Sequence, residues 1–365
     1  MDKKKVIYID TCHDVAGGQR SLIALLSKIK NEVNYDILID KNNLKYKNEL
    51  IKSGIELNRI KTLNSIPLKS RALGGLNVFF RTLVLGRRYS IAHCNTFYDG
   101  LFAMPSFRLW GGKTVFRARC GIDLSNHGLI DSLIYNFSTV VLANSEYVKN
   151  TFKRVSNSLS KIQVIYNPLD LKFLDKPTVV ESNGKTIIAV IGAITEVKNQ
   201  MEVLKAFSLL EDDDLILRFI GEPRSTSKDK EYYESLERFV LEKGISEKIQ
   251  FTGFISDVRT HLNDVSLVCV PSDREPLGRV IFESQLYQIP VLASDSGGNS
   301  ELIEDGRTGY LYNLGDVEQL STKLMLAKKD NRLISENAKS FIIKRFSPEK
   351  TYLAELAIYN KISGE

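Results

Sequence analysis

Two glutamates in the segment SDREPLGRVIFESQLYQIP (272–290) are the residues whose type and spacing first suggest chemistry. A helix is predicted from about Arg279 to Tyr287, so Glu275 lies in the loop before it and Glu283 lies more than one turn inside it. A carboxylate can accept hydrogen bonds from both hydroxyls of a vicinal diol, which makes each acid a candidate for binding a sugar. Two unrelated acids, one in a turn and one on a helix surface, are the simpler alternative.

Backbone N–H groups lie between the two acids. Leu277, Gly278 and Arg279 form the start of the predicted helix, where the first N–H groups have no partner within the helix. The positive end of the helix dipole favours an anion there, and phosphate in particular. The order carboxylate, anion site, carboxylate matches a sugar, its diphosphate and a ribose along one ligand.

Two further loops combine glycine with the start of a helix. Gly17 and Gly18 precede a helix predicted at 19–29, and the segment VIGAITEVKNQ (190–200) places Lys198 at the start of another. Each loop could offer N–H groups to a phosphate, and the lysine could add its positive charge. A turn without a ligand and a solvated lysine are the alternatives for each loop alone. Together the loops favour a diphosphate.

Short β-branched runs alternate with helical segments almost throughout the chain, which predicts parallel α/β layers. The fold class is therefore α/β, with two Rossmann-like domains that we expect to face each other across a cleft, where the carboxyl ends of the strands bind ligands. The predicted strands are 6–9, 35–40, 91–94, 114–118, 139–143 and 162–166, and then 186–192, 215–221, 249–253, 266–271 and 290–294.

A linker is predicted at 167–185, which holds two prolines and a polar tail. It separates an N-terminal domain, residues 1–167, from a C-terminal domain, residues 168–345. Residues 346–365 begin with a Ser-Pro-Glu helix opening and carry a helical stripe. We expect this last helix to pack across the domain interface.

The composition is typical of a soluble globular protein, with 43% hydrophobic and 26% charged residues among 365. No apolar stretch reaches membrane-spanning length, no signal peptide is evident, and the four cysteines have no metal-ligand spacing. A cytoplasmic protein is therefore predicted. The net charge of +6 fits a phosphorylated ligand or anionic lipid. No nucleic-acid-binding motif accompanies it, so nucleic acid is not an expected partner.

The segment EPLGRVIFE, followed by SQLYQIPVLASDSGGNSELIEDGRTGYL, resembles the donor-binding signature of family 4 of the retaining glycosyltransferases, which have the GT-B fold. Similar pieces follow the family's order over nearly the whole chain: GGQRSL (17–22), VVLANSEYVKNTF (140–152), KIQVIYNPLD (161–170), VIGAITEVKNQ (190–200) and IQFTGFISDV (249–258). The resemblance implies metal-independent transfer of a sugar from a nucleotide sugar to a glycan or lipid-linked acceptor, without a cofactor.

The resemblance also assigns residues to the second domain's donor site. Glu275 would bind the sugar hydroxyls, Lys198 the diphosphate and Glu283 the ribose diol, and the first two would be the catalytic residues. The donor-binding residues that it implies are Gly17, Gly18, Gly253, Phe254, Leu277, Gly278, Arg279 and Glu283.

Two positions depart from the family's pattern. Ala193 stands where members usually have an arginine for the diphosphate, so a second cation would come from Arg279 or Arg224. Cys120 stands where many relatives have a histidine near the sugar. The further candidates for lining this pocket are Arg119, Asp123 and His93.

Residues 68–90 interleave basic and bulky apolar side chains, among them Arg81, Arg87, Phe79 and Phe80. On a helix this mixture could dock on anionic lipid headgroups at the inner face of a membrane. A helix that buries its apolar stripe and solvates its basic face is the simpler alternative.

Two other functions fit the same residues. A sugar-nucleotide epimerase of similar fold would convert its substrate without an acceptor, so incubation with the donor alone distinguishes it. A non-catalytic subunit that binds a sugar nucleotide is suggested by Ala193 and Cys120, and it would stay inactive until its partner was added.

Overall fold

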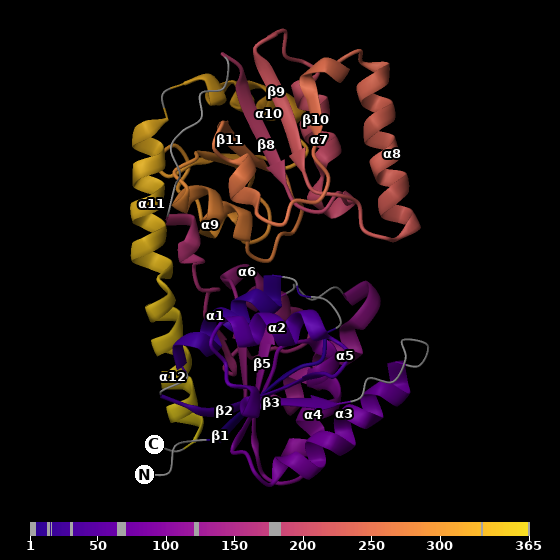
Figure 1. Cartoon of the computed structure of the whole chain (residues 1–365), viewed down its shortest axis with the longest axis vertical. Coiled ribbons are helices and arrows are strands. Elements are labelled where there is room, and N and C mark those ends of the chain that lie inside the picture. Colours follow the sequence, from indigo (N-terminus) through magenta and orange to yellow (C-terminus); the bar gives the residue numbers. More distant parts are fainter. Residues whose placement is uncertain are drawn as a thin grey trace. The chain divides into compact units, whose positions relative to one another are not determined.

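Two parallel sheets organise the chain in the computed structural model (Figure 1). The structure describes residues 5–12, 15, 17–29, 32–63, 71–119, 124–174, 184–329 and 331–363. One compact unit comprises Met1–Pro168 together with Phe346–Glu365, and the other comprises Leu169–Arg345. The predicted fold class, α/β with two Rossmann-like sheets, is confirmed.

The sheet of the first unit has the strand order β3-β2-β1-β4-β5-β6-β7, and all its neighbours pair in parallel. Its strands are β1 (Lys5–Asp10), β2 (Asn34–Asp40), β3 (Ile60–Leu63), β4 (Ile91–Cys94), β5 (Lys113–Ala118), β6 (Val140–Ala143) and β7 (Ile162–Val164). Its helices include α1 (Gly17–Ile29), α2 (Leu44–Lys52), α3 (Arg71–Gly86), α4 (Phe97–Arg108), α5 (Leu124–Phe137), α6 (Glu146–Thr151) and α12 (Pro348–Ile362).

Both faces of this sheet are buried, because successive side chains of each strand point to opposite sides. On β1, Val6 and Tyr8 join the core beneath α1, α2 and α12. Ile7 and Ile9 join the core beneath α3, α4, α5 and α6. The chain order reverses between β1 and β4, and their carboxyl ends form the ligand-binding position of such a sheet.

The C-terminal helix α12 packs on the sheet of the first unit. Tyr359 is 2% exposed, and its hydroxyl forms a 2.8 Å hydrogen bond with the hydroxyl of Tyr8. Glu355, on the same helix, is buried and forms an ion pair with the buried Arg117 of β5, at 3.2 Å. Residues far apart in the sequence thus complete one core.

The sheet of the second unit has the order β10-β9-β8-β11-β12-β13, again with parallel neighbours. The chain order reverses between β8 and β11. The strands are β8 (Thr186–Ile191), β9 (Leu215–Ile220), β10 (Ile249–Phe251), β11 (Val265–Val270), β12 (Val291–Ser294) and β13 (Tyr310–Tyr312).

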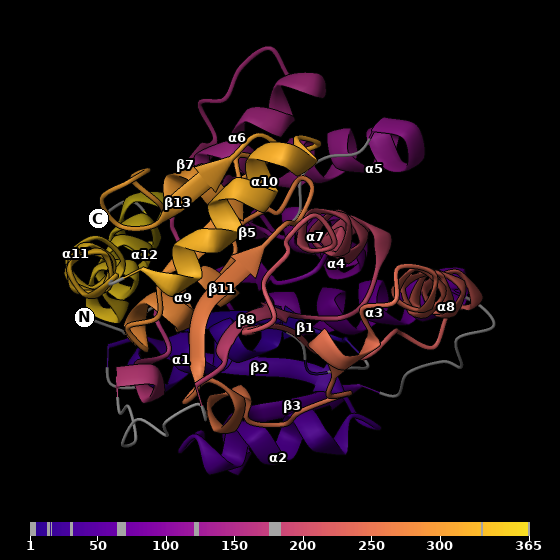
Figure 2. The same ribbon diagram turned by 90° about the horizontal axis from the view of Figure 1, so that it is seen from above.

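Helices α7 (Gln200–Phe207), α8 (Ser227–Glu242) and α10 (Val317–Leu324) share one hydrophobic core with the strands of this second sheet. Helix α7 lies beside α10, as Figure 2 shows. Helix α9 (Arg279–Leu286) packs on β11 and β12, and α11 (Arg332–Phe346) precedes α12. No helix in the described part of the chain is long and apolar enough to cross a lipid bilayer.

We predict that Glu355→Ala destabilises the first unit by about 3–5 kcal/mol, because it leaves Arg117 buried without its ionic partner. The measurement is the urea unfolding transition. Glu349→Ala, at an exposed position on the same helix, is the control and should cost less than about 1 kcal/mol. Equal midpoints for the two variants would contradict the role of the buried pair.

Candidate functional site

The loop between β11 and α9 carries Glu275, and its carboxylate contacts Lys198, the other predicted catalytic residue. Nζ of Lys198 lies 2.6 Å from Oε2 of Glu275, although 77 residues separate them in the sequence. The lysine side chain is 26% exposed and the glutamate side chain 15%, so both are accessible from outside but largely sheltered. In the second sheet these residues follow β8 and β11, the two strands at the reversal of chain order.

Glu283 lies inside α9 as predicted and forms an ion pair with Arg279, one turn earlier, at 2.9 Å. Helix α9 starts after Gly278, with no side-chain cap and no acid in its first turn, so no carboxylate there offsets the positive end of the helix dipole. Leu277, just before it, is buried. The predicted order along the chain, from Glu275 through this helix start to Glu283, is therefore present.

A second loop, after β12, fixes the backbone of Glu275. The N–H of Gly298 donates to the carbonyl of Glu275 at 2.7 Å. Gly297 has a φ of +68°, and a Cβ atom there would lie 2.2 Å from the carbonyl oxygen of Glu275 and 2.6 Å from its nitrogen. Only glycine allows this close approach. The sequence resemblance covered these glycines but assigned them no role.

The start of α9 is held by the same loop. A Cβ atom on Gly278 would lie 2.9 Å from Oδ1 of Asn299, so a larger residue here would displace the Asn299 side chain. Asn299 is buried, and its amide group donates to the carbonyl and hydroxyl oxygens of Ser294, at 3.3 and 3.2 Å. The loop after β12 thus fixes the start of α9 as well as Glu275.

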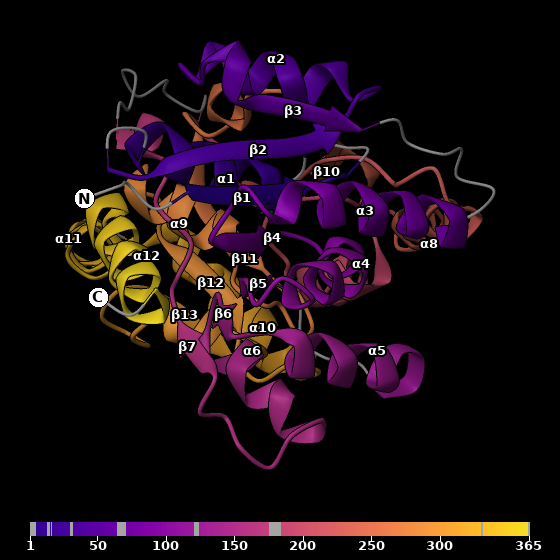
Figure 3. The ribbon, with the colours of Figure 1, turned by 90° about the horizontal axis from the view of Figure 1, so that it is seen from below.

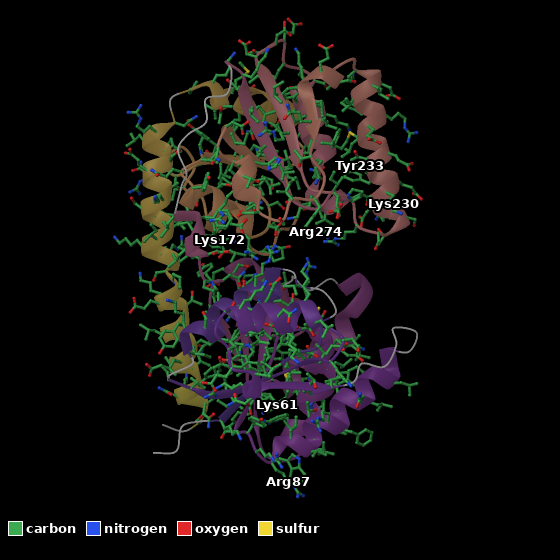
Figure 4. The ribbon with its side chains drawn as sticks, viewed as in Figure 1. Lys61, Arg87, Lys172, Lys230, Tyr233 and Arg274 are labelled. Atoms are coloured by element: carbon green, nitrogen blue, oxygen red, sulfur yellow. The ribbon has the colours of Figure 1, made fainter. Side chains whose placement is uncertain are left out.

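The turn that carries Lys198 is connected to the loop between β11 and α9. The N–H of Asp273 donates to the carbonyl of Val197 at 2.9 Å. Gly192, before this turn, has a φ of +138°, a backbone conformation that favours glycine, and a Cβ atom there would be in ordinary contact with Cε of Lys198, at 3.7 Å. Arg274, between Asp273 and Glu275, is exposed at the edge of the loop and is labelled in Figure 4.

Ala193, where the resemblance leads one to expect an arginine, accepts a 3.0 Å hydrogen bond at its carbonyl from the Gln200 side chain. Of the two cations considered in its place, Arg279 is paired with Glu283. Arg224 is exposed and follows Pro223, which forms a β-bridge with Ile194. Arg224 therefore lies close to the loop that carries Ala193.

The stretch predicted to lie against a base follows β10. Gly253 has a φ of +70° and forms a β-bridge with Gly221. The ring of Phe254 is 62% exposed, which is unusual for a phenylalanine. An exposed aromatic face is available for stacking there.

In the first unit, Gly17 and Gly18 open α1, next to Arg119. A Cβ atom on Gly18 would lie 3.2 Å from Nη1 of Arg119, which donates to Oδ1 of Asn95. Burial lowers the pKa of Arg119 to about 10, and the nearby Arg117 acts in the same direction. The guanidinium remains charged at neutral pH. The structure thus brings together two glycines and a cation that the sequence predicted separately.

His93 does not reach the surface. It is 1% exposed on β4, and its Nδ1 lies 2.6 Å from the hydroxyl of Tyr359 and 3.3 Å from Oε1 of Glu355. Burial holds the pKa of His93 well below its usual range, and Arg117 adds to this shift. His93 therefore packs against α12 and does not line a pocket for a ligand. Asp123 and Cys120 lie outside the described residues.

No group of three His, Cys, Asp or Glu side chains that could hold a metal ion occurs within the described residues. The expectation of metal-independent chemistry without a cofactor stays a prediction.

Residues 173–344 match the family model of the glycosyl transferases group 1. This segment contains Lys198, Glu275 and Glu283 together with the loops that hold them. The match therefore covers nearly all of the second unit, Leu169–Arg345.

Among curated proteins, the chain is 24% identical over 250 residues to an N-acetyl-alpha-D-glucosaminyl L-malate synthase of Bacillus anthracis, covering 66% of this chain and 64% of that protein. It is 30% identical over 124 residues to the lipopolysaccharide core biosynthesis glycosyltransferase LpsE of Rhizobium meliloti, covering 33% and 36%. These matches thus span less than two thirds of either relative.

Among solved structures, the Anabaena protein HepE in complex with UDP has a TM-score of 0.84 at 18% identity, covering 98% of this chain and all of that one. Its complex with UDP-glucose has a TM-score of 0.83, also at 18% identity, covering 98% of this chain and 99% of that one. This similarity shows the fold, and the GT-B fold predicted from the sequence is confirmed.

We predict that Gly297→Ala destabilises the second unit more than Gly306→Ala does. Both glycines have a φ near +70°, but a Cβ atom on Gly306 would meet nothing within 4 Å. Each variant should lose about 1–2 kcal/mol from the left-handed backbone. Gly297→Ala should lose about 1–3 kcal/mol more from the contact with Glu275. Urea unfolding of both variants measures this, and equal losses would contradict the close contact.

Proposed function

We propose that the protein transfers a sugar from a nucleoside diphosphate sugar to an acceptor hydroxyl, with retention of anomeric configuration and without a metal ion or other cofactor. The observation that carries the proposal is the pairing of Lys198 with Glu275 beside the uncapped start of α9, within the segment that matches the glycosyl transferases group 1. The bound UDP-glucose of HepE, a protein with the same fold, supports a nucleotide sugar as donor.

In this proposal the diphosphate binds at Lys198 and the start of α9. The lysine ammonium has three N–H donors, so it can keep its hydrogen bond to Glu275 and still donate to phosphate oxygens. As the bond to the sugar breaks, negative charge develops on the diphosphate. A fixed cation and helix start stabilise that charge without having to rearrange.

The two carboxylates would hold the two ends of the donor. Glu275 accepts hydrogen bonds from sugar hydroxyls, and Glu283 accepts them from the ribose diol. Phe254 offers its exposed ring to the base. By the family resemblance, the acceptor hydroxyl attacks from the face that the diphosphate leaves, and the departing phosphate takes its proton. Positioning of the reactants is then the main contribution of the protein.

The first unit would supply the acceptor side, and Gly17, Gly18 and Arg119 would lie toward the phosphate or sugar. The name of the relative LpsE supports bacterial surface polysaccharide, lipopolysaccharide or glycoconjugate synthesis, with a glycan or lipid-linked acceptor. We also propose that the protein acts in the cytoplasm, where nucleotide sugars serve as its donors, at the inner face of the membrane.

A split between binding and turnover tests the assigned carboxylates. Glu283→Ala should weaken UDP binding by about 10–100-fold, because it removes a charge-assisted hydrogen bond of about 1.5–3 kcal/mol. Glu275→Ala should leave UDP affinity nearly unchanged and lower transfer by on the order of a hundredfold or more. Calorimetric titration with UDP measures the first effect. Transfer from the nucleotide sugar that gives the largest thermal stabilisation measures the second.

Glu304→Gln is the matched control, since Glu304 is an exposed acid that is also paired with an arginine three residues away. It should change neither UDP affinity nor turnover. Normal turnover in Glu275→Ala would refute the proposed role of Glu275. Conversion of the donor without any acceptor would instead favour an epimerase.

A further inference from the structure

Helix α3 packs closely on α4 with its inner face, as Figures 1 and 3 show. Val78 and Thr82 are buried there, and the hydroxyl groups of Thr82 and Ser106 are 2.7 Å apart. A Cβ atom on Gly75 would lie 2.2 Å from the ring of Phe102, so only glycine permits this approach. The helix cannot rotate to bury its other face without losing this packing.

The outer face of α3 exposes four apolar side chains in one row. Leu73, Leu76, Phe80 and Val84 follow each other at intervals of three, four and four residues, which places them on one face of a helix. Each of them is at least 48% exposed. The alternative from the sequence, a helix that buries an apolar stripe and solvates its basic residues, holds for the inner face, where Val78 and Leu85 are buried, but it does not account for this exposed row. A contiguous exposed apolar row marks a contact surface.

The turn after α4 extends this row. Leu109 is 68% exposed and Trp110 is 43% exposed. Nε1 of Trp110 donates to the carbonyl of Leu83 on α3 at 2.9 Å, and the guanidinium of Arg87 lies 4.1 Å from the centre of the indole ring. Figure 4 labels Arg87 at this end of the helix. We call the six exposed apolar residues the α3 surface: Leu73, Leu76, Phe80, Val84, Leu109 and Trp110.

Positive charge surrounds the α3 surface. Between residues 71 and 113 the only acid is Asp99, which is fully buried. Asp36, which accepts a hydrogen bond from Tyr89 just after α3, has a side chain that is only 13% exposed. The same stretch holds six basic residues: Arg71, Arg81, Arg87, Arg88, Arg108 and Lys113.

We propose that the α3 surface docks on a membrane that contains anionic lipids. The apolar row would enter the boundary between headgroups and acyl chains, and the exposed arginines 81, 87, 88 and 108 would bind lipid phosphates. A second copy of this chain is a poorer occupant, because a two-fold contact would bring the same arginines face to face. This inference rests on the proposed location at the inner face of a membrane and names the surface that makes the contact, but docking itself requires neither the proposed donor nor the proposed acceptor.

Fluorescence of the intact protein tests the proposal, because Trp110 is the one tryptophan in the sequence. The probe is a vesicle of equal parts phosphatidylglycerol and phosphatidylcholine, compared with one of phosphatidylcholine alone. We expect the emission of Trp110 to shift to shorter wavelength, and the protein to float with the vesicles, only when phosphatidylglycerol is present. High salt should weaken this binding.

The test variant is Phe80→Glu combined with Val84→Glu, which places two charges in the apolar row and should lower the bound fraction by on the order of tenfold or more. The control is Leu241→Glu on α8, a leucine that is 72% exposed, and it should bind as the unaltered protein does. Unfolding transitions of both variants show whether they fold.

Three results would overturn the proposal: no binding to either vesicle, equal binding to both vesicles, or full binding by the double variant. A concentration-dependent dimer that the double variant abolishes would assign the surface to a second copy instead. Vesicle binding by a protein that transfers no sugar would sink the proposed function and leave the docking surface standing.

Discussion

Close backbone contact between the loops after β11 and β12 is the constraint on which the candidate site depends. Gly297 approaches the backbone of Glu275 so closely that no side chain fits between them, and the N–H of Gly298 donates to the carbonyl of Glu275. The same loop supplies Asn299, which contacts the start of α9 at Gly278. The carboxylate and the start of the helix are therefore positioned together by one short segment. Substitutions in the loop after β12 should therefore affect ligand binding even if its side chains do not contact the ligand.

The charges of the two units are arranged differently. In the second unit, both candidate carboxylates are paired with cations that are about one quarter exposed, so the pairs can accept another charged partner. In the first unit, Arg117 and Glu355 are fully buried and join α12 to the sheet. Breaking a buried pair costs far more than loosening a solvated one. The first arrangement suits ligand exchange, and the second suits a permanent structural connection.

Much of the fold was predictable, because buried parallel strands have a strong signal in runs of β-branched residues. The strands missed were β3 and β13, which lie at sheet edges and have only four and three residues. The position of Glu283 inside a helix was predictable from local pattern. The pairing of Lys198 with Glu275 was not, because no local pattern encodes which loops meet. The alternation of side chains along a strand places His93 on one face of β4, but it does not predict that a C-terminal helix covers that face.

The first unit is discontinuous in sequence, since α12 is separated from β7 by the whole of the second unit. On the ribosome, residues 1–168 emerge long before Glu355 and Tyr359 exist to cover Tyr8, His93 and Arg117. Until α12 is made, that half carries a charged guanidinium and apolar side chains on an open face, whereas the second unit has all its described strands once residue 312 is made. The nascent first unit is therefore the half that should most need protection by chaperones before release.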